Sequence, residues 1–323
     1  MGIRRGLKRA LAALCPPTVP SNDLGPSFAA GGAEEDTANP IAAEERGYRC
    51  GRFDIELTPG HKLPEYRRAH PLYDRFLPVL ASALPAGTHV VDVGANVGDT
   101  YASMISENPR LHFHCFEPDP EFFKALSRNV AKIQLEAPVQ PEFRPDLVNA
   151  YVGAGGAIQG ALVSRNGSAS IKLDAGSENI NLIPLDVYLD EHRRVLDSAP
   201  LILIKSDVDG FDFGVINSLG KYLLRDDLLL YFECQCQEIF QLEEFTRLIQ
   251  NLERQGWVFS VFDNFGNVML IDTDAATVNG LLRYIWRQQV GQASRTVWYL
   301  DVLARGKDGT AWVTQTLWQY CGA

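Results

Sequence analysis

The feature that most constrains this chain is the segment His89–Thr100, in which an apolar strand is followed at once by a glycine loop. The valines within residues 90–93 are β-branched and suit a strand that is covered on both faces. Gly94 and Gly98 let the backbone turn sharply and approach a ligand without a Cβ in the way. Residues 100–108 are predicted to form a helix. A strand, a glycine loop and a helix in this order indicate a doubly wound α/β fold with its ligand at the carboxyl end of the strand.

The residues of the loop argue against the two commonest phosphate-binding sites. A dinucleotide site would have glycine in place of Asn96, because the backbone there must reach a pyrophosphate. No Gly-Lys-Ser/Thr sequence follows, so the loop is not a P-loop. Asp92 precedes the first glycine, and its carboxylate would repel a phosphate but attract a cationic ligand. S-adenosylmethionine fits, since it carries an ammonium and a sulfonium and no phosphate. A strand-turn-helix without a ligand is the alternative.

An acid follows at the spacing expected for a ribose contact. Residues 112–116 are predicted to form the next strand, and Glu117 comes about 20 residues after the loop, where a carboxylate can accept both hydroxyls of a ribose. This placement fits any adenosine ligand.

Three motifs together resemble a known family. They are Val-Asp-Val-Gly-Ala-Asn-Val-Gly-Asp at 91–99, Phe-Glu-Pro-Asp at 116–119 and Ile-Lys-Ser-Asp-Val-Asp-Gly-Phe at 204–211. In this order they resemble the FkbM family of S-adenosylmethionine-dependent methyltransferases. The resemblance runs from about Asp54 to about Val261.

The resemblance implies a fold, a cofactor and a reaction. The fold is the Rossmann-like sheet of class I methyltransferases, mostly parallel with an antiparallel edge hairpin, and the cofactor is S-adenosylmethionine. Members of the family methylate hydroxyls of sugars and polyketides, which implies O-methyl transfer to a sugar, a glycan or a similar hydroxylated metabolite. The end of the third predicted strand, residues 147–152, would meet the adenine ring. The implied cofactor contacts are Asp92, Gly94, Asn96, Gly98, Glu117, Pro118, Val152 and Asp207.

The third motif departs from the family's usual Lys-Ile-Asp-Val-Glu-Gly, because Ser206 replaces the Ile and Asp209 replaces the Glu. Asp207 leaves the carboxyl end of a buried strand predicted at 200–206, and Asp209 follows at the turn. Two acids this close raise each other's proton affinity, so one of them becomes a better base toward an acceptor hydroxyl. We predict that Asp207 and Asp209 are catalytic. The alternative is that Asp207 only caps a helix beginning near Gly210 and Asp209 only holds the loop.

A helix that begins after Pro71, with Phe76, Leu77, Leu80 and Leu84 on its buried side, is predicted to precede the first strand and cover the ligand pocket. Four aromatic or imidazole side chains around its start are therefore candidates to face that pocket, although for each taken singly a packing or surface role is more common than catalysis. They are His61, Tyr66, His70 and Tyr73. His61 is our third candidate for a catalytic group.

The rest of the chain continues the alternation of strands and helices. The five tryptophans fall in its final quarter, where they form either core or a platform for sugar rings. Further predicted elements are a half-exposed strand at 53–57, a helix at 120–129, a hairpin at 160–185 turning at Asn166-Gly167, a strand at 228–233, a helix at 238–255, a hairpin of 257–262 with 267–271, a helix at 275–289 and a strand at 297–304.

The composition limits how many domains the chain can form and which partners it can bind. The 323 residues are 46% apolar, enough for one large domain, which we place at 47–323. Residues 1–46 are predicted to be a disordered basic tail and linker, with at most weak membrane contact through residues 1–15. A net charge of −10 argues against nucleic acid as a partner. The six scattered cysteines predict reduced thiols and a cytoplasmic protein. Cys234-Gln-Cys236 lacks a second cluster at zinc-ligand spacing, so no metal site is predicted.

Two other functions share parts of this pattern. An NAD(P)-dependent Rossmann oxidoreductase would also use Glu117, but Asn96 argues against it. A catalytically inactive nucleoside-binding protein would keep the loop and lose the acids of the third motif, whereas here those acids are present.

Overall fold

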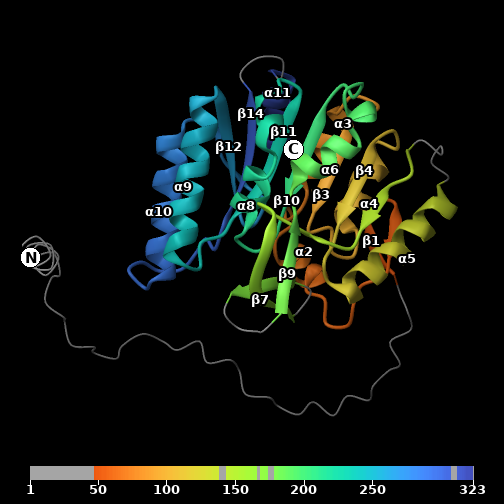
Figure 1. Cartoon of the computed structure of the whole chain (residues 1–323), viewed down its shortest axis with the longest axis horizontal. Coiled ribbons are helices and arrows are strands. Elements are labelled where there is room, and N and C mark those ends of the chain that lie inside the picture. The colour runs from red at the N-terminus through yellow and green to blue at the C-terminus, as the bar shows by residue number, and fades with distance from the viewer. Residues whose placement is uncertain (1–46, 138–142, 166–167, 174–177, 307–310, 323) are drawn as a thin grey trace, which may run out of the picture. The chain divides into compact units, whose positions relative to one another are not determined.

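The computed structural model describes residues 47–137, 143–165, 168–173, 178–306 and 311–322, which belong to one folded unit (Figure 1). The tail and linker predicted for residues 1–46, and the membrane contact predicted for residues 1–15, lie outside the described residues and stay predictions. Among the described residues, none of the helices has the length and apolarity needed to cross a bilayer.

The main sheet has eight strands in the order β13-β12-β14-β11-β10-β3-β4-β5, and Figure 1 shows most of them side by side across the domain. β3, β4, β5, β10 and β11 run parallel. Their bounds are β3 His89–Val93, β4 His112–Phe116, β5 Asp146–Val148, β10 Ile202–Ser206, β11 Leu228–Cys234, β12 Trp257–Asp263, β13 Val268–Thr273 and β14 Leu300–Gly306.

The order of the strands reverses beside β3. From β3 the chain moves outward to β4 and β5, and it then returns to build β10 and β11 on the other side of β3. This reversal leaves a crevice at the carboxyl ends of β3 and β10, where open α/β sheets bind their ligands.

The predicted fold class is confirmed: the sheet is doubly wound and mostly parallel, and β12 and β13 form the antiparallel edge hairpin. The structure adds one feature that the sequence did not indicate. β14 is inserted antiparallel between β11 and β12, so a second antiparallel strand lies inside the sheet.

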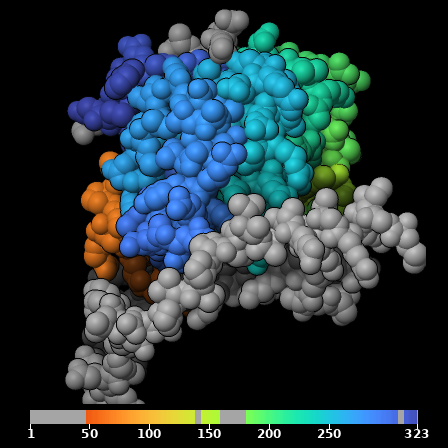
Figure 2. Space-filling view, turned by 90° about the vertical axis from the view of Figure 1, so that its left-hand side faces the viewer, coloured from red at the N-terminus to blue at the C-terminus, as the bar shows by residue number. Residues whose placement is uncertain are grey.

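Helices cover both faces of this sheet. One core is built by α6 to α10 with the short 3-10 helix η2, and the other by α2 to α5 with α11. Figure 1 shows α9 and α10 beyond one end of the row of strands, and in Figure 2 they form the surface of that side. Their bounds are α2 Leu63–Ala69, α3 Phe76–Ala83, α4 Asp99–Glu107, α5 Pro120–Glu136, α6 Leu185–Glu191, α7 Arg193–Leu196, α8 Asp212–Asn217, η2 Gly220–Leu224, α9 Ile239–Arg254, α10 Ala275–Gln289 and α11 Ala311–Cys321.

The central strands are rich in apolar residues because both of their faces are covered. All five residues of β3 and all five of β10 are buried. Val91 and Val93 pack into the α6–α10 core, whereas Val90 packs into the opposite one. The pleat therefore sends alternate side chains to the two cores, and neither face can carry a run of polar residues.

Helix starts follow local capping chemistry. The Asp119 carboxylate accepts hydrogen bonds from the backbone N–H groups of Glu121 and Phe122, at 2.8 and 3.0 Å, and Pro120 occupies the first helical position of α5. Asp274 caps α10 in the same way through the Thr277 N–H at 2.8 Å. These caps fix the starts of the helices that follow β4 and β13.

The bounds of several predicted elements differ from the structure, among them the helix predicted at 120–129, which continues to Glu136. The strand predicted at 147–152 is two strands: β5 ends at Val148, and β6, Tyr151–Val152, belongs to a separate sheet. The helix predicted after Pro71 begins only at Phe76, because residues 71–74 form a turn in which Asp74 has a φ of +56°.

The separate sheet contains the hairpin predicted at 160–185. It has the order β6-β9-β7-β8, and Arg165 of β7 pairs with Ser168 of β8. The predicted turn residues Asn166 and Gly167 lie outside the described residues. The bounds are β7 Gly156–Arg165, β8 Ser168–Leu173 and β9 Glu178–Ile183, and a two-stranded sheet is formed by β1 Tyr48–Cys50 and β2 Phe53–Ile55.

The five cysteines within the described residues are free thiols, and Cys15 lies outside those residues. Cys234 ends β11, and both it and Cys236 are buried in the same core. Their spacing therefore serves packing at the end of the strand.

Candidate active site

A cavity of about 610 Å³ lies at the carboxyl ends of the parallel strands. Val93 and Gly94 reach it from β3, Glu117 from the end of β4, and Asp207 from the end of β10. Of the predicted cofactor contacts, six line this cavity: Gly94, Asn96, Glu117, Pro118, Val152 and Asp207. The four residues predicted around the covering helix, His61, Tyr66, His70 and Tyr73, line it as well.

Gly94 makes the close approach that the loop requires. Its φ is +80°, and a Cβ at this position would lie 2.0 Å from the backbone carbonyl oxygen of Asp207. The Asp207 N–H donates to the Val93 carbonyl at 3.0 Å on the same side. A side chain at position 94 would therefore separate the glycine loop from the third motif.

Gly98 lies where α4 packs against α5. Its φ is +86°, and a Cβ there would lie 2.8 Å from Cδ1 of Leu126 on α5, and the residue is not among those that line the cavity. The structure thus gives Gly98 a packing role, and its contact with the cofactor stays a prediction. Its missing side chain lets α4 begin close against α5.

Asp92, also predicted to contact the cofactor, is not among the residues that line the cavity. Its side chain is fully buried behind the loop, where Oδ1 lies 2.9 Å from Nζ of Lys205. Lys205 donates to the Gly94 carbonyl at 2.9 Å and lies 3.9 Å from Oδ2 of Asp207. Asp92 thus acts through Lys205, which joins the glycine loop to the third motif.

Asp92 and Lys205 each stabilise the charged form of the other. Burial would lower the pKa of Lys205, but the charges of Asp92 and Asp207 outweigh it and raise that pKa above its usual value. Burial raises the pKa of Asp92, and Lys205 opposes that rise. At a separation of 2.9 Å a protonated lysine keeps the carboxylate ionised, so we describe the two as an ion pair at neutral pH.

Glu117 holds the loop from the next strand. Its Oε2 accepts the Asn96 N–H and its Oε1 accepts the Asp119 N–H, both at 2.8 Å. Burial raises the pKa of Glu117 to about 7, although these two backbone donors lower it. Each carboxylate oxygen keeps a lone pair for another donor, so the side chain can still accept the hydroxyls of a ribose in the cavity.

The third motif forms a tight turn held by Asp212. Its Oδ1 accepts the Ser206 hydroxyl at 2.6 Å and the Val208 N–H at 3.2 Å, and its Oδ2 accepts the Gly210 N–H at 3.3 Å. Ser206, which departs from the family motif, is thus the partner of a fully buried carboxyl group. Asp212 is also the first residue of α8, and the helix has no side-chain cap. The alternative that Asp207 caps this helix is therefore wrong.

Asp207 and Asp209 both reach the cavity. Asp207 is 55% exposed and its charge faces Lys205, whereas Asp209 has a φ of +53°, a conformation that aspartate tolerates better than most residues. Burial, and then the charge of Asp207, raise the pKa of Asp209 to about 7. Asp209 therefore binds a proton more tightly than a free aspartate does, and burial contributes more to this than the neighbouring acid.

His61 lines the cavity, but both of its ring nitrogens are engaged. Nδ1 accepts the backbone N–H of Leu63 at 3.2 Å, which places the ring proton on Nε2, and Nε2 lies 3.2 Å from Oδ1 of Asn96. No lone pair is left for an acceptor hydroxyl. In this arrangement His61 orients the side chain of Asn96, and a catalytic role for His61 stays a prediction.

Several cavity residues were not predicted. Glu233 of β11 is 6% exposed, and its Oε1 has no hydrogen-bond partner among the described residues. Asp301 of β14 lies in the same wall, and burial, then Asp207, raise the pKa of both carboxyl groups well above the usual range. Of the five tryptophans, Trp298 lines the cavity and is 50% exposed, and Trp257 is core. Lys205 stood inside the third motif, but β14 could not be placed beside β11 from the sequence.

The sheet order, the glycine loop and the acid that holds it define an α/β protein of the class that binds a nucleoside cofactor at the strand reversal. Residues 92–259, just over half of the chain, match the family described as Methyltransferase FkbM domain. The chain belongs to this family of methyltransferases, and the identification from the three motifs is confirmed. None of the curated proteins matches the sequence.

Solved structures with a similar fold are distant in sequence. Methyltransferase FkbM from Methylobacillus flagellatus is 14% identical, with a TM-score of 0.40, and the match covers 64% of this chain and 56% of that one. An S-adenosylmethionine-dependent O-methyltransferase from Thermotoga maritima is 11% identical, with a TM-score of 0.36 and coverage of 82% and 79%. The plantazolicin methyltransferase BpumL, in complex with S-adenosylhomocysteine, is 11% identical, with a TM-score of 0.35 and coverage of 75% and 88%. The chain thus spans little more than half of the Methylobacillus protein.

Proposed function

We propose that this protein transfers the methyl group of S-adenosylmethionine to a hydroxyl of a sugar, a glycan or a similar hydroxylated metabolite. The observation that carries the proposal is that Asp209, a carboxyl group with a pKa near 7, opens into the same cavity as the glycine loop and Glu117. A base and a cofactor site in one cavity are what O-methyl transfer requires.

The cofactor would lie over the carboxyl ends of β3 and β4. Gly94 and Asn96 would face its methionine part, Glu117 would accept the ribose hydroxyls, and Pro118 and Val152 would flank the adenine. The acids of the cavity offset the positive charges of the ammonium and the sulfonium. The sulfonium already activates the methyl group, so the protein has only to align donor and acceptor in a site that excludes water.

The acceptor hydroxyl would meet Asp209. As the oxygen attacks the methyl carbon, its proton passes to the Asp209 carboxylate, the carbon–sulfur bond breaks, and S-adenosylhomocysteine leaves with the electron pair on sulfur. Glu233 and Asp301 are suited to accept hydrogen bonds from further hydroxyls, and the exposed ring of Trp298 offers an apolar face on which a sugar can stack. The net charge of −10 favours such an acceptor over nucleic acid.

The two other functions have less support. An NAD(P) pyrophosphate would have to approach the backbone at Asn96, whose side chain is held by His61, and its charge would be repelled by the acids around it. An inactive binding protein has no need of Asp209 in the cavity. Both functions remain measurable alternatives.

The experiment is methyl transfer from labelled S-adenosylmethionine into fractionated cell glycans. We expect Asp209→Asn to lower the rate by about 10²-fold or more while cofactor affinity stays nearly unchanged, because Asn keeps the backbone conformation and loses the base. Asp226→Asn removes an exposed acid outside the cavity and serves as the matched control. Full activity of Asp209→Asn would refute the assignment of the base, and incorporation of label into no fraction would refute the acceptor class.

A further inference from the structure

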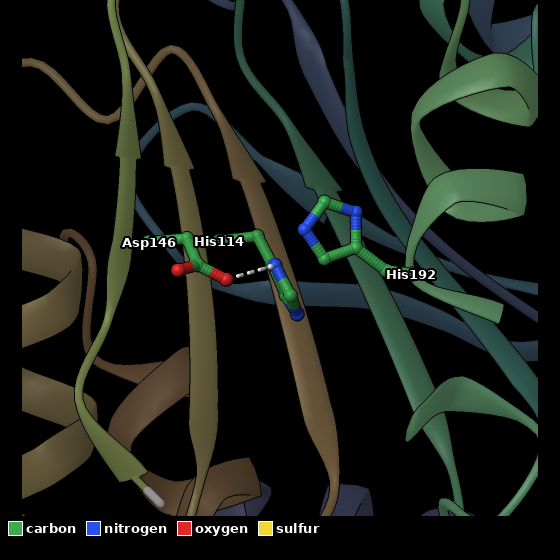
Figure 3. Close-up of side chains that lie close together, drawn as sticks. All are labelled: His114, Asp146 and His192. Carbon is green, nitrogen blue, oxygen red and sulfur yellow. Dashed lines mark ion pairs between the residues drawn. The ribbon is translucent and has the colours of Figure 1, made fainter. Parts of the chain in front are cut away.

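We propose that His114, Asp146 and His192 form a binding site for a divalent metal ion of the zinc class, away from the cofactor cavity. The three residues come from β4, β5 and the link between α6 and α7, and their ligand atoms lie within 4.8 Å of one another. Figure 3 shows the Asp146 carboxylate and the two imidazole rings turned toward a common point. Four of the six histidines of the chain gather here, since His89 and His112 stack beside His114 at the start of β3 and β4.

His192 has the tautomer that a metal ligand needs. Its Nδ1 lies 2.9 Å from the backbone carbonyl oxygen of Tyr188. A carbonyl oxygen can only accept, so Nδ1 carries the proton, and Nε2 of the neutral ring keeps its lone pair. Metal-bound histidines are oriented in this way, with the second nitrogen donating to a carbonyl or a carboxylate. Figure 3 shows the other ring nitrogen of His192 facing His114.

His114 is oriented by a second imidazole. Its Nε2 lies 2.9 Å from Nδ1 of His89, a distance that requires one proton between the two nitrogens. With that proton on His114, its Nδ1 keeps one lone pair, which a metal ion could take in place of the Tyr188 hydroxyl 3.0 Å away. The same Nδ1 lies 3.2 Å from Oδ2 of Asp146. A proton on Nδ1 makes this contact a hydrogen bond to Asp146, and a metal ion bound by the two residues would replace that proton.

The donor set selects the kind of metal. Two imidazole nitrogens and one carboxylate oxygen suit zinc and its neighbours in the first transition row, whereas magnesium and calcium prefer oxygen ligands alone. The Asp146 side chain is 56% exposed, so an ion can enter and water can complete its coordination. An ion bound here would tie the α6–α7 link to β4 and β5. The ligands are 32 and 46 residues apart in sequence, so no short spacing motif marks the site.

The test is a titration of the full chain, stripped of metal, with Zn²⁺ and with Co²⁺, followed by calorimetry and by the visible spectrum of Co²⁺. We expect one ion per chain, a visible absorption of low-symmetry Co²⁺ bound to nitrogen, and a rise in melting temperature. His192→Ala and Asp146→Asn each remove one ligand and should weaken binding by about tenfold or more. Both residues are partly exposed, so the variants are expected to fold, which circular dichroism can check.

Glu191→Gln is the matched control, because it removes an exposed charge next to His192 and leaves the three ligands in place. It should bind Zn²⁺ as tightly as the wild type. The proposal is overturned if the wild type shows no saturable binding. It is equally overturned if both ligand variants keep wild-type affinity, because the ion would then be bound elsewhere on the acidic surface.

Discussion

Replacing Lys205 with methionine should destabilise the fold by an amount that can be worked out from its contacts. Nζ lies 2.9 Å from Asp92 Oδ1 and donates to the Gly94 carbonyl at 2.9 Å. Without the lysine, the fully buried Asp92 carboxylate has lost its counter-charge, and such a loss typically costs about 3–5 kcal/mol. The variant can avoid a buried charge by protonating Asp92, so the free energy of that protonation sets an upper limit on the loss of stability. Neutralising a carboxyl group of ordinary pKa 3.8 at pH 7 takes about 4 kcal/mol, at about 1.36 kcal/mol per pH unit.

The same reasoning gives a pH dependence. At pH 5 the cost of protonating Asp92 falls to about 2 kcal/mol, so the deficit of Lys205→Met relative to the wild type should be roughly half as large as at pH 7. The assay is guanidinium unfolding followed by circular dichroism at both pH values. The double variant Asp92→Asn with Lys205→Met removes both charges and should recover most of the lost stability. A deficit under about 1 kcal/mol at pH 7, or a double variant as unstable as Lys205→Met alone, would refute the buried ion pair.

Three further predictions concern the loop, pH and the tail. Gly94→Ala should destabilise the fold and abolish cofactor binding. The control Gly291→Ala is also at a positive φ but has no atom within 4 Å of the new Cβ, so it should lower the stability by only about 1–2 kcal/mol. Equal losses of stability in unfolding experiments would show that backbone strain alone acts at Gly94. The free energy of unfolding of the ligand-free protein should fall as the pH rises from about 4 to 7. The reason is that buried carboxyl groups with a pKa near 7, such as Glu117, Asp209 and Asp212, bind protons more tightly in the folded state. A free energy of unfolding that rises over this range in denaturant titrations would contradict this prediction. A chain that begins at Gly47 should keep full methyl-transfer activity on a soluble acceptor, and loss of turnover would assign residues 1–46 a part in the site.

Much of the cofactor side of the site could be predicted from sequence because it is local. The glycine loop and Glu117 each follow directly from one strand, so the order of residues fixes which end of the sheet they reach. Gly94 is required at its position by the carbonyl of Asp207, and the motif alone indicated a close approach there. The group that approaches Gly94 closely is the backbone carbonyl of Asp207, in the third motif.

The rest of the site could not be predicted from the sequence, because it depends on contacts between segments far apart in the chain. Asp92 was interpreted as a ligand contact because its partner Lys205 lies more than a hundred residues away, and only the pairing of β3 with β10 brings the two together. Glu233 and Asp301 are opposite each other on neighbouring strands because β14 is inserted beside β11. His61 was a reasonable base by residue type, and only the structure shows that both of its ring nitrogens are engaged in hydrogen bonds.

The central claim is that the cavity binds the methyl-donor cofactor through the glycine loop and Glu117, and calorimetry with S-adenosylhomocysteine tests it most directly. We expect one molecule to bind per chain, NAD to give no heat, and Glu117→Ala to weaken binding by about ten- to a hundred-fold, since a lost charge-assisted hydrogen bond costs about 1.5–3 kcal/mol. Saturable binding of NAD without binding of S-adenosylhomocysteine would contradict the account, and so would an affinity that Glu117→Ala leaves within about two-fold of the wild type.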